Sequence, residues 1–237
     1  MKILDEIRRE LENQKEEEYR VGAIRFFKEE VYPIGVRAWK VREISKKIFK
    51  ENLEKKSKKE IFDLAIKLLN KKTHEESLVA FDWMSKVHKE YQKEDLKFFE
   101  HIVSNYMTNW HFCDDFCFKV LGKYFATYPE DMKKVEDWVT NKNRWYRRVG
   151  YVSLIPLVRK NNEKAFKQCL KIYSNIFNEK EDIVQKGCGW LLKDSTRYFG
   201  DVVYKEIIKN KNHLPRTTLR IAIEKMDSNQ KKEAMSK

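Results

Sequence analysis

Apolar residues recur along most of this chain with the three-to-four-residue spacing of amphipathic helices. Clear stripes of this kind occupy Ile3–Leu11 and Ile61–Leu69. Only 7 glycines and 4 prolines occur in 237 residues, too few for a turn-rich β architecture, and no segment alternates like a strand. The sequence therefore predicts an all-α fold of about twelve helices joined by short polar links.

Several residues mark where these helices should begin or end. Thr73 and Glu76 match a capping box ahead of an apolar helical segment. Pro156 falls inside a helix that begins near Arg144, and a proline there should kink or end it. Gly200 suits the end of a later helix, because glycine adopts the left-handed conformation common at helix ends.

The helices recur at a rough period. Asp114 lies 34 residues before Arg148, which lies 38 residues before Lys186, and each is near the start of an expected helix. This is the spacing of helix-pair repeats, which stack into a curved solenoid. We predict one HEAT-like repeat domain over residues 1–226 with a concave basic face, and a polar, disordered tail over 227–237. The alternative is an ordinary helical globule in which the spacings coincide by chance.

The chain is strongly basic. Its 50 Lys and Arg residues outnumber 37 Asp and Glu residues, which gives a formal net charge of +13 at pH 7. Such an excess favours a polyanionic partner, nucleic acid before a membrane surface.

Compartment is indicated by the cysteines and by the N-terminus. The four cysteines form no CxxC pair and lie in apolar or mixed helical stretches, which suits buried free thiols in a reducing cytoplasm. The N-terminus lacks the apolar core of a signal peptide, and no later run is long enough to cross a bilayer. We expect a cytoplasmic protein without membrane contact, associated with the nucleoid through DNA. The four cysteines of the sequence are Cys113, Cys117, Cys169 and Cys188.

Trp110 and Asp114 are four residues apart and therefore share one face of a helix. A carboxylate beside an aromatic wall can stabilise positive charge that develops during a reaction. The plainer interpretation is a half-buried tryptophan with a solvated aspartate on the same helix.

Two further segments combine residue types that suit contact with nucleic acid. Asn143–Arg148 interleaves arginines with aromatic residues. The plainer interpretation is a solvated basic helix start with Trp145 in the core, which still leaves at least one of its arginines to face the partner. Gln185–Trp190 contains two glycines, and each costs about 1 kcal/mol inside a helix. Close approach of a ligand backbone or of a neighbouring helix would explain them.

A cluster of metal-ligand residue types follows Trp110, but its spacing does not suit a metal. Cys113 and Cys117 share a helix face, whereas His111 points elsewhere, and no second ligand cluster follows at zinc-finger spacing. Asp114 and Asp115 do not complete such a set. We predict neither a metal site nor a cofactor.

These motifs resemble those of the AlkD family of bacterial DNA glycosylases, the HEAT-like-repeat DNA alkylation repair proteins. The resemblance covers about Ile7 to Met226, with Trp110 and Asp114 first, then the segments 143–148 and 185–190 in order. The segment Tyr32–Gly35 also fits the family's region after its second helix.

The resemblance implies roles for four residues. Trp110 and Trp190 would be aromatic walls beside the sugar of the modified nucleotide, and Asp114 the catalytic carboxylate. Arg148 would complete the cleft and hold the DNA backbone. The family removes cationic purines, 3-methyladenine and 7-methylguanine, from duplex DNA in base excision repair. Its cleft grips backbone and sugar without turning the base into a pocket.

Four positions depart from the family pattern. His111 stands where the family often has an acidic residue, and Phe26 where it can have tyrosine. Pro156 and Lys193 replace a lysine and an arginine that the family can have. These departures bear on phosphate contacts and substrate range and leave the four residues above intact.

We expect a monomer that binds double-stranded DNA carrying alkylated bases. Two other hypotheses stay open: a non-catalytic helical-repeat DNA-binding protein, and a scaffold for an acidic protein partner. The residues predicted to contact DNA are Arg37, Arg42, Arg144, Arg147, Lys186 and Lys193.

Overall fold

The computed structural model describes residues 2–236 and divides them into two compact units. Unit 1 runs to Ile102 and includes Tyr106–Val120, and unit 2 consists of Val103–Asn105 and the chain from Leu121 onward. Residues 2–236 contain helices and no strand, which confirms the predicted all-α class. The single domain predicted over residues 1–226 stays a prediction, since one helical array can contain two such units.

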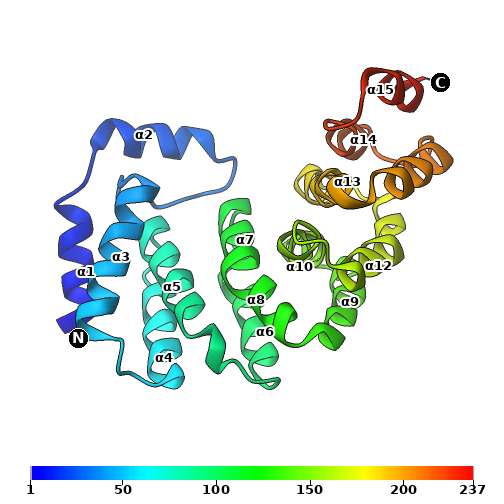
Figure 1. Cartoon of the computed structure of the whole chain (residues 1–237). Helices are drawn as coiled ribbons and strands as arrows, with labels where there is room; N and C mark the ends of the chain where they lie inside the picture. The colour runs from blue at the N-terminus through cyan, green and yellow to red at the C-terminus, as the bar shows by residue number, and fades with distance from the viewer. Residues whose placement is uncertain (1, 237) are drawn as a thin grey trace. The chain divides into compact units, whose positions relative to one another are not determined.

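Unit 1 is built from helices whose apolar stripes meet in a common core. In Figure 1 helix α2 crosses the run of the other helices of this unit, and none of its residues is buried. The fully buried side chains of unit 1 include Trp83, Phe81 and Phe99. The α-helices are α1 (Lys2–Glu12), α2 (Glu17–Phe26), α3 (Ala38–Asn52), α4 (Lys58–Leu69), α5 (His74–Lys86), α6 (Asp95–Tyr106) and α7 (Trp110–Phe116).

Unit 2 begins where a π-helical segment, Cys117–Leu121, continues α7 into the next helix. Its longest helix, α13, packs against α10 and α14 and carries a kink at Phe199. The α-helices are α8 (Gly122–Thr127), α9 (Val135–Val139), α10 (Arg144–Val152), α11 (Ile155–Val158), α12 (Glu163–Ile172), α13 (Asp182–Asn210), α14 (Arg216–Ala222) and α15 (Ser228–Met235).

Two of the predicted helix boundaries agree with the structure and the third does not. Thr73 precedes α5, but its hydroxyl donates to the Glu76 carboxylate at 2.5 Å rather than accepting a backbone N–H. Pro156 lies in the first turn of α11, after α10 has ended. The helix end predicted at Gly200 is wrong, because only Phe199 departs from helical backbone angles and α13 continues to Asn210.

Residues 228–235 form a helix where the sequence predicted a disordered tail. The Asp227 carboxylate accepts N–H bonds from Asn229 and Gln230, and the Gln230 side chain accepts the Asp227 N–H in return. This capping box, together with burial of Ala234, offsets the polar composition that suggested fraying.

All four cysteines are free and buried, as predicted. Burial raises the pKa of Cys169 to about 12, partly countered by a hydrogen bond with Ser195. Burial, and then the neighbouring Cys169, raise the pKa of Cys188 well above its usual value. The thiols of Cys169 and Cys188 are therefore protonated at neutral pH.

Candidate functional site

Helix α7 places Trp110 and Asp114 on successive turns. The buried Asn109 side chain accepts the Phe112 N–H at 3.0 Å, so the helix begins at Trp110. Trp110 and Asp114 are both half-buried and share one face, as their spacing predicts.

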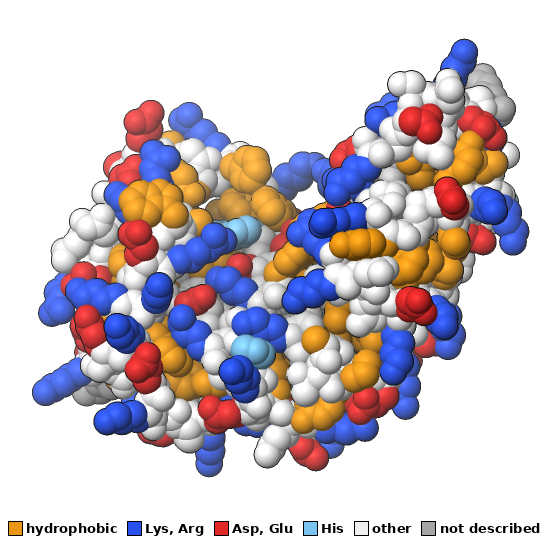
Figure 2. Space-filling view, viewed as in Figure 1, with side chains coloured by type: hydrophobic (Ala, Val, Ile, Leu, Met, Phe, Trp, Pro, Cys, Tyr) orange, Lys and Arg blue, Asp and Glu red, His pale blue; other side chains and the backbone are white. Residues whose placement is uncertain are grey.

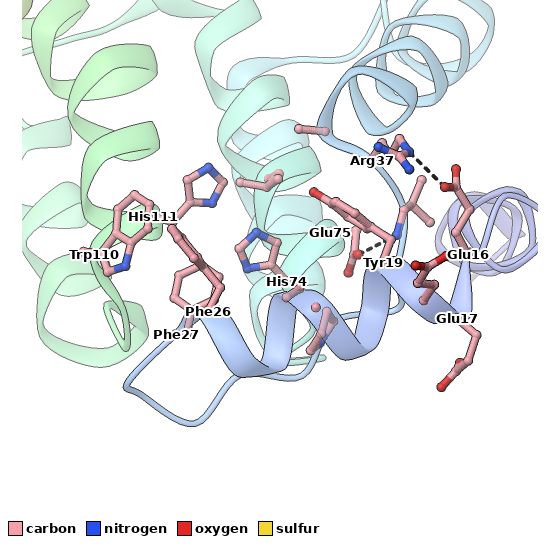
Figure 3. Close-up of a pocket in the computed structure, with 17 residues that line it drawn as sticks. Glu16, Glu17, Tyr19, Phe26, Phe27, Arg37, His74, Glu75, Trp110 and His111 are labelled. Carbon is pink, nitrogen blue, oxygen red and sulfur yellow. Dashed lines mark hydrogen bonds and ion pairs between the residues drawn. The ribbon is translucent and has the colours of Figure 1, made fainter.

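Trp110 lies in an aromatic cluster formed with the C-terminal end of α2. Its ring stacks on Phe27 with centroids 5.4 Å apart and an interplanar angle of 24°. Phe26 meets the same indole edge-on at 5.9 Å although 70% of Phe26 is exposed to solvent. Figure 2 shows hydrophobic side chains beside a histidine in this region, and Figure 3 shows these rings together. The indole is therefore held in place on unit 1 itself.

His111 belongs to this cluster. Its ring stacks on His74 with centroids 4.8 Å apart. Burial, and then the neighbouring His111, lower the pKa of His74 to about 3. Burial also lowers the pKa of His111, against the opposite pull of Asp115 and Asp114. Among residues 2–236, no three His, Cys, Asp or Glu side chains are grouped to hold a metal ion.

A cavity of about 790 Å³ opens beside Trp110 within unit 1 (Figure 3). Helix α2 contributes one wall, and the beginnings of α3, α5 and α7 contribute others. Trp110, His111 and Phe26 lie at one end of the cavity, and Glu16 and Arg37 at the other. The predicted site residue Trp110 thus borders the cavity, whereas Asp114 is one helical turn further along α7.

Glu75 at the start of α5 organises the loop before α3 and was not among the predicted site residues. Its carboxylate is 1% exposed and accepts the N–H groups of Ile34, Gly35 and Val36 at 2.8–2.9 Å. Gly35 has a φ of +106°, and a Cβ there would lie 2.7 Å from the Arg20 side chain. The only signal in the sequence was this glycine within the Tyr32–Gly35 segment.

Arg148 packs inside unit 2. The side chain is 5% exposed and donates to the Ile183 carbonyl at 2.5 Å. Gly187 lies against α10, where an added Cβ would approach the Val152 side chain to 3.3 Å. Gly189 similarly allows α14 to approach, since its Cβ would lie 2.8 Å from the Thr218 carbonyl. Of the two explanations for these glycines, the structure supports helix packing.

The other arginines of the 143–148 segment also contact the protein. Arg147 pairs with Glu179 at 2.6 Å and donates to two backbone carbonyls. Arg144 pairs with Glu181 at 3.4 Å and covers Trp145, which is buried in the core as the plainer interpretation held. The segment thus anchors α10 to the start of α13.

Trp190 is fixed by a buried carboxylate that was also not among the predicted site residues. Its indole N–H donates to Asp194 at 3.0 Å, and the Arg159 guanidinium lies 5.5 Å from the ring centre. Asp194 is 2% exposed and accepts from Arg159 at 2.6 Å and Lys225 at 3.0 Å. Asp194 lies four residues after Trp190, so helical spacing could have indicated it.

The remaining predicted DNA-contacting residues lie at the surface of their units. Arg37 pairs with Glu16 at 2.9 Å, Lys186 with Asp182 at 2.7 Å and Lys193 with Glu224 at 2.8 Å. Arg42 is exposed on α3. Surface pairs of this kind contribute little to stability, so these cations can exchange their carboxylates for phosphates. Their contact with DNA stays a prediction.

The structure therefore places the four central residues as two pairs. Trp110 and Asp114 share α7 in unit 1, while Arg148 packs against α13, the helix that carries Trp190, in unit 2. The convergence of the two pairs stays a prediction.

Replacing Asp194 with Asn is expected to lower the free energy of unfolding at pH 7 by about 2 kcal/mol. Burial acts to raise the pKa of Asp194, but hydrogen bonds and charges from Lys225 and Arg159 outweigh it and lower that pKa. Its stabilising contribution is thus complete above the unfolded pKa of about 4 and is lost as the pH falls below it. Urea unfolding at pH values between 7 and 3 measures the free energy of unfolding of both proteins. This free energy should decrease less with falling pH in the variant than in the wild type. The same pH dependence in both proteins would contradict the stabilising role of Asp194.

The chain has the all-α, helical-repeat fold of DNA alkylation repair proteins. The family model described as DNA alkylation repair enzyme matches residues 7–226, and the chain belongs to this family. A predicted DNA alkylation repair enzyme from Enterococcus faecalis superposes with a TM-score of 0.74 at 20% identity, covering 91% of this chain and 98% of that one. The protein smu.31 from Streptococcus mutans UA159 superposes with a TM-score of 0.55 at 20% identity, covering 79% of this chain and 98% of that one.

Comparison with curated proteins gave no match. The family supports a role in the repair of alkylation damage and DNA as the substrate. Along residues 2–236, no helix combines the length and apolar character needed to cross a membrane.

Proposed function

We propose that this protein is a DNA glycosylase that hydrolyses the N-glycosidic bond of cationic alkylated purines, 3-methyladenine and 7-methylguanine, in duplex DNA. The observation that carries the proposal is the pairing of Trp110 and Asp114 on α7. Both are half-buried, on successive turns, and Trp110 is braced by aromatic neighbours. Membership of the DNA alkylation repair family supports the same reaction class.

One carboxylate suffices for this substrate class because the leaving group already carries a positive charge. Glycoside hydrolases commonly use a second carboxyl group to protonate the leaving group. A purine alkylated at N3 or N7 needs no such proton, and the remaining barrier is positive charge developing on the deoxyribose. Asp114 stabilises that charge and positions a water. Neutral lesions with poor leaving groups are accordingly poor substrates.

The two tryptophans act as walls beside the sugar. Each aromatic face contributes about 0.5–2 kcal/mol of attraction to the developing cation, depending on desolvation. Asp194 and Arg159 hold the Trp190 ring, and Arg148 fixes the first turns of α13 from within. Arg148 thus acts here as a positioning residue for α13.

The direct test measures release of free 7-methylguanine or 3-methyladenine from methylated duplex DNA by the full chain. Release is expected for both bases. Folded protein that binds this DNA without releasing base would sink the proposal and favour the non-catalytic DNA-binding protein instead. We also propose that the protein acts as a monomer in the cytoplasm.

DNA affinity should fall steeply with salt, since bound Lys and Arg displace counterions from the phosphates. With several of the predicted cations engaged, the logarithm of the association constant is expected to fall by at least about 3 per tenfold increase in salt. Fluorescence anisotropy with labelled duplex at several salt concentrations measures this slope. Arg42→Gln should reduce it by about 1. A DNA association constant that does not change with salt concentration would favour a scaffold for an acidic protein partner.

A further inference from the structure

Two aromatic rings lie at the surface of unit 1 with a cation beside each. Trp39, in the first turn of α3, is 55% exposed, and the Lys40 ammonium lies 5.6 Å from its ring centre. Tyr19 on α2 is 36% exposed, and the Arg37 guanidinium lies 5.2 Å from its ring centre. Large aromatic side chains are costly to leave in water and are enriched where proteins meet partners. The exposed rings therefore indicate a contact surface.

A single carboxylate joins the two ring–cation pairs into one surface. Glu16 accepts a hydrogen bond from Arg37 at 2.9 Å and another from Lys40 at 3.0 Å. Figure 3 shows the first of these contacts beside Tyr19. Two cations share one carboxylate, so the cluster between the rings keeps a net positive charge. Because surface ion pairs contribute little to stability, a phosphate can take the place of Glu16 there.

The exposed face of α3 extends this surface with further positive charge. Three exposed cations follow Trp39 at intervals of three and four residues, the spacing of one helix face, and they are Arg42, Lys46 and Lys50. Glu43 is exposed beside them, so three cations stand against one carboxylate. A basic track that begins at an exposed aromatic ring is the combination with which proteins bind unpaired nucleic-acid strands.

We propose that this surface binds single-stranded nucleic acid, with bases stacked on Trp39 and Tyr19 and a phosphate held between them. An unpaired strand offers the flat faces of its bases to aromatic rings, whereas the bases of an intact duplex are already stacked on one another. The cations beside both rings favour a polyanion over an apolar protein partner. The inference goes beyond the proposed glycosylase function and does not depend on it, since neither ring belongs to the Trp110–Asp114 pair and no base leaves a duplex.

The test measures binding of the full chain to two labelled strands of equal charge by fluorescence anisotropy. One probe is an oligothymidine of about twelve nucleotides, a length within the range of single-strand sites. The other has the same number of abasic deoxyribose phosphates and therefore lacks bases. We expect the thymidine strand to bind at least about fivefold more tightly, the factor that one stacked base supplies. Equal affinity for both strands, or binding of neither, would overturn the proposal.

Trp39→Leu locates the stacked base without altering the charge of the protein. Trp39 is exposed and leucine is the better helix former, so the fold is expected to persist. The affinity for the thymidine strand should fall at least about fivefold, and the affinity for the abasic strand should stay unchanged. Tyr19→Leu should act in the same way, whereas Trp39→Phe, which retains a ring, should keep most of the affinity.

Tyr198→Leu is the matched control for these variants. Tyr198 is 45% exposed and has the Arg197 guanidinium 5.3 Å from its ring centre, but it lies on α13 in unit 2. This variant should bind both strands like the wild type. An equal loss in Tyr198→Leu, or unchanged affinity in Trp39→Leu, would contradict the site.

Undamaged duplex DNA distinguishes stacking on bases from contact with the backbone. Trp39→Leu should weaken binding of the thymidine strand more than binding of the duplex, since the duplex does not offer free base faces. An equal loss for both would mean that the ring packs on sugars and would overturn the proposal. Base release from methylated duplex tests the glycosylase separately, so either proposal can fail while the other holds.

Discussion

An Asp114→Asn variant is expected to release 7-methylguanine at least about 100-fold more slowly than the wild type, the usual cost of removing one electrostatic contact to a charged transition state. Asparagine keeps the shape of aspartate and removes the charge that stabilises the deoxyribose cation. Asp114 is half-buried at the surface of α7, so the substitution should leave the fold intact. Single-turnover release from methylated duplex DNA measures the effect.

Asp115→Asn is the matched control for this variant. Asp115 is the next residue on α7, is also half-buried and pairs with Lys119 at 3.1 Å. It faces about 100° away around the helix. A much smaller decrease is expected from it. If Asp114→Asn excises at the wild-type rate, or if both variants lose activity equally, Asp114 is not the catalytic carboxylate.

A Glu75→Gln variant is expected to lose about 3 kcal/mol of unfolding free energy, because the substitution leaves a buried N–H group without an acceptor. The Glu75 carboxylate accepts N–H groups on both oxygens from Ile34, Gly35 and Val36. An amide offers one oxygen and one NH₂, so at least one buried N–H would face another donor. Urea unfolding at pH 7 measures the loss, and the loop before α3 should become sensitive to proteolysis.

Glu18→Gln serves as the control for Glu75→Gln, because it makes the same chemical change at an exposed position of α2. Its effect should be small, as for most surface substitutions. A Glu75→Gln protein as stable as the control would mean that the loop before α3 does not depend on this carboxylate.

Local spacing predicted those parts of the fold and site that depend on one helix at a time. The i, i+4 relation put Trp110 and Asp114 on one face, and the structure has them on successive turns of α7. Proline placement correctly predicted that the helix beginning at Arg144 ends before Pro156. Each of these depends on backbone geometry within a few residues, which sequence records directly.

Features that depend on distant partners could not be predicted in this way. Glu75 resembles an ordinary helix-surface carboxylate until the loop at 34–36 is placed around it. Spacing relates Asp194 to Trp190 but does not reveal the cations on other helices that pair with Asp194. Arg148 was expected to face DNA, yet its side chain is buried and donates to the carbonyl of Ile183, 35 residues later. Burial of a charge is decided by such long-range packing.

The burial of the four thiols has a consequence for how this protein withstands the damage that its family repairs. Agents that methylate DNA are electrophiles, and the thiolate is the most readily attacked form of a protein side chain. Cys169 and Cys188 are protonated and enclosed, and Cys113 and Cys117 are shielded by the core beneath α7. The fold therefore keeps these four thiols away from a methylating agent in the surrounding solvent.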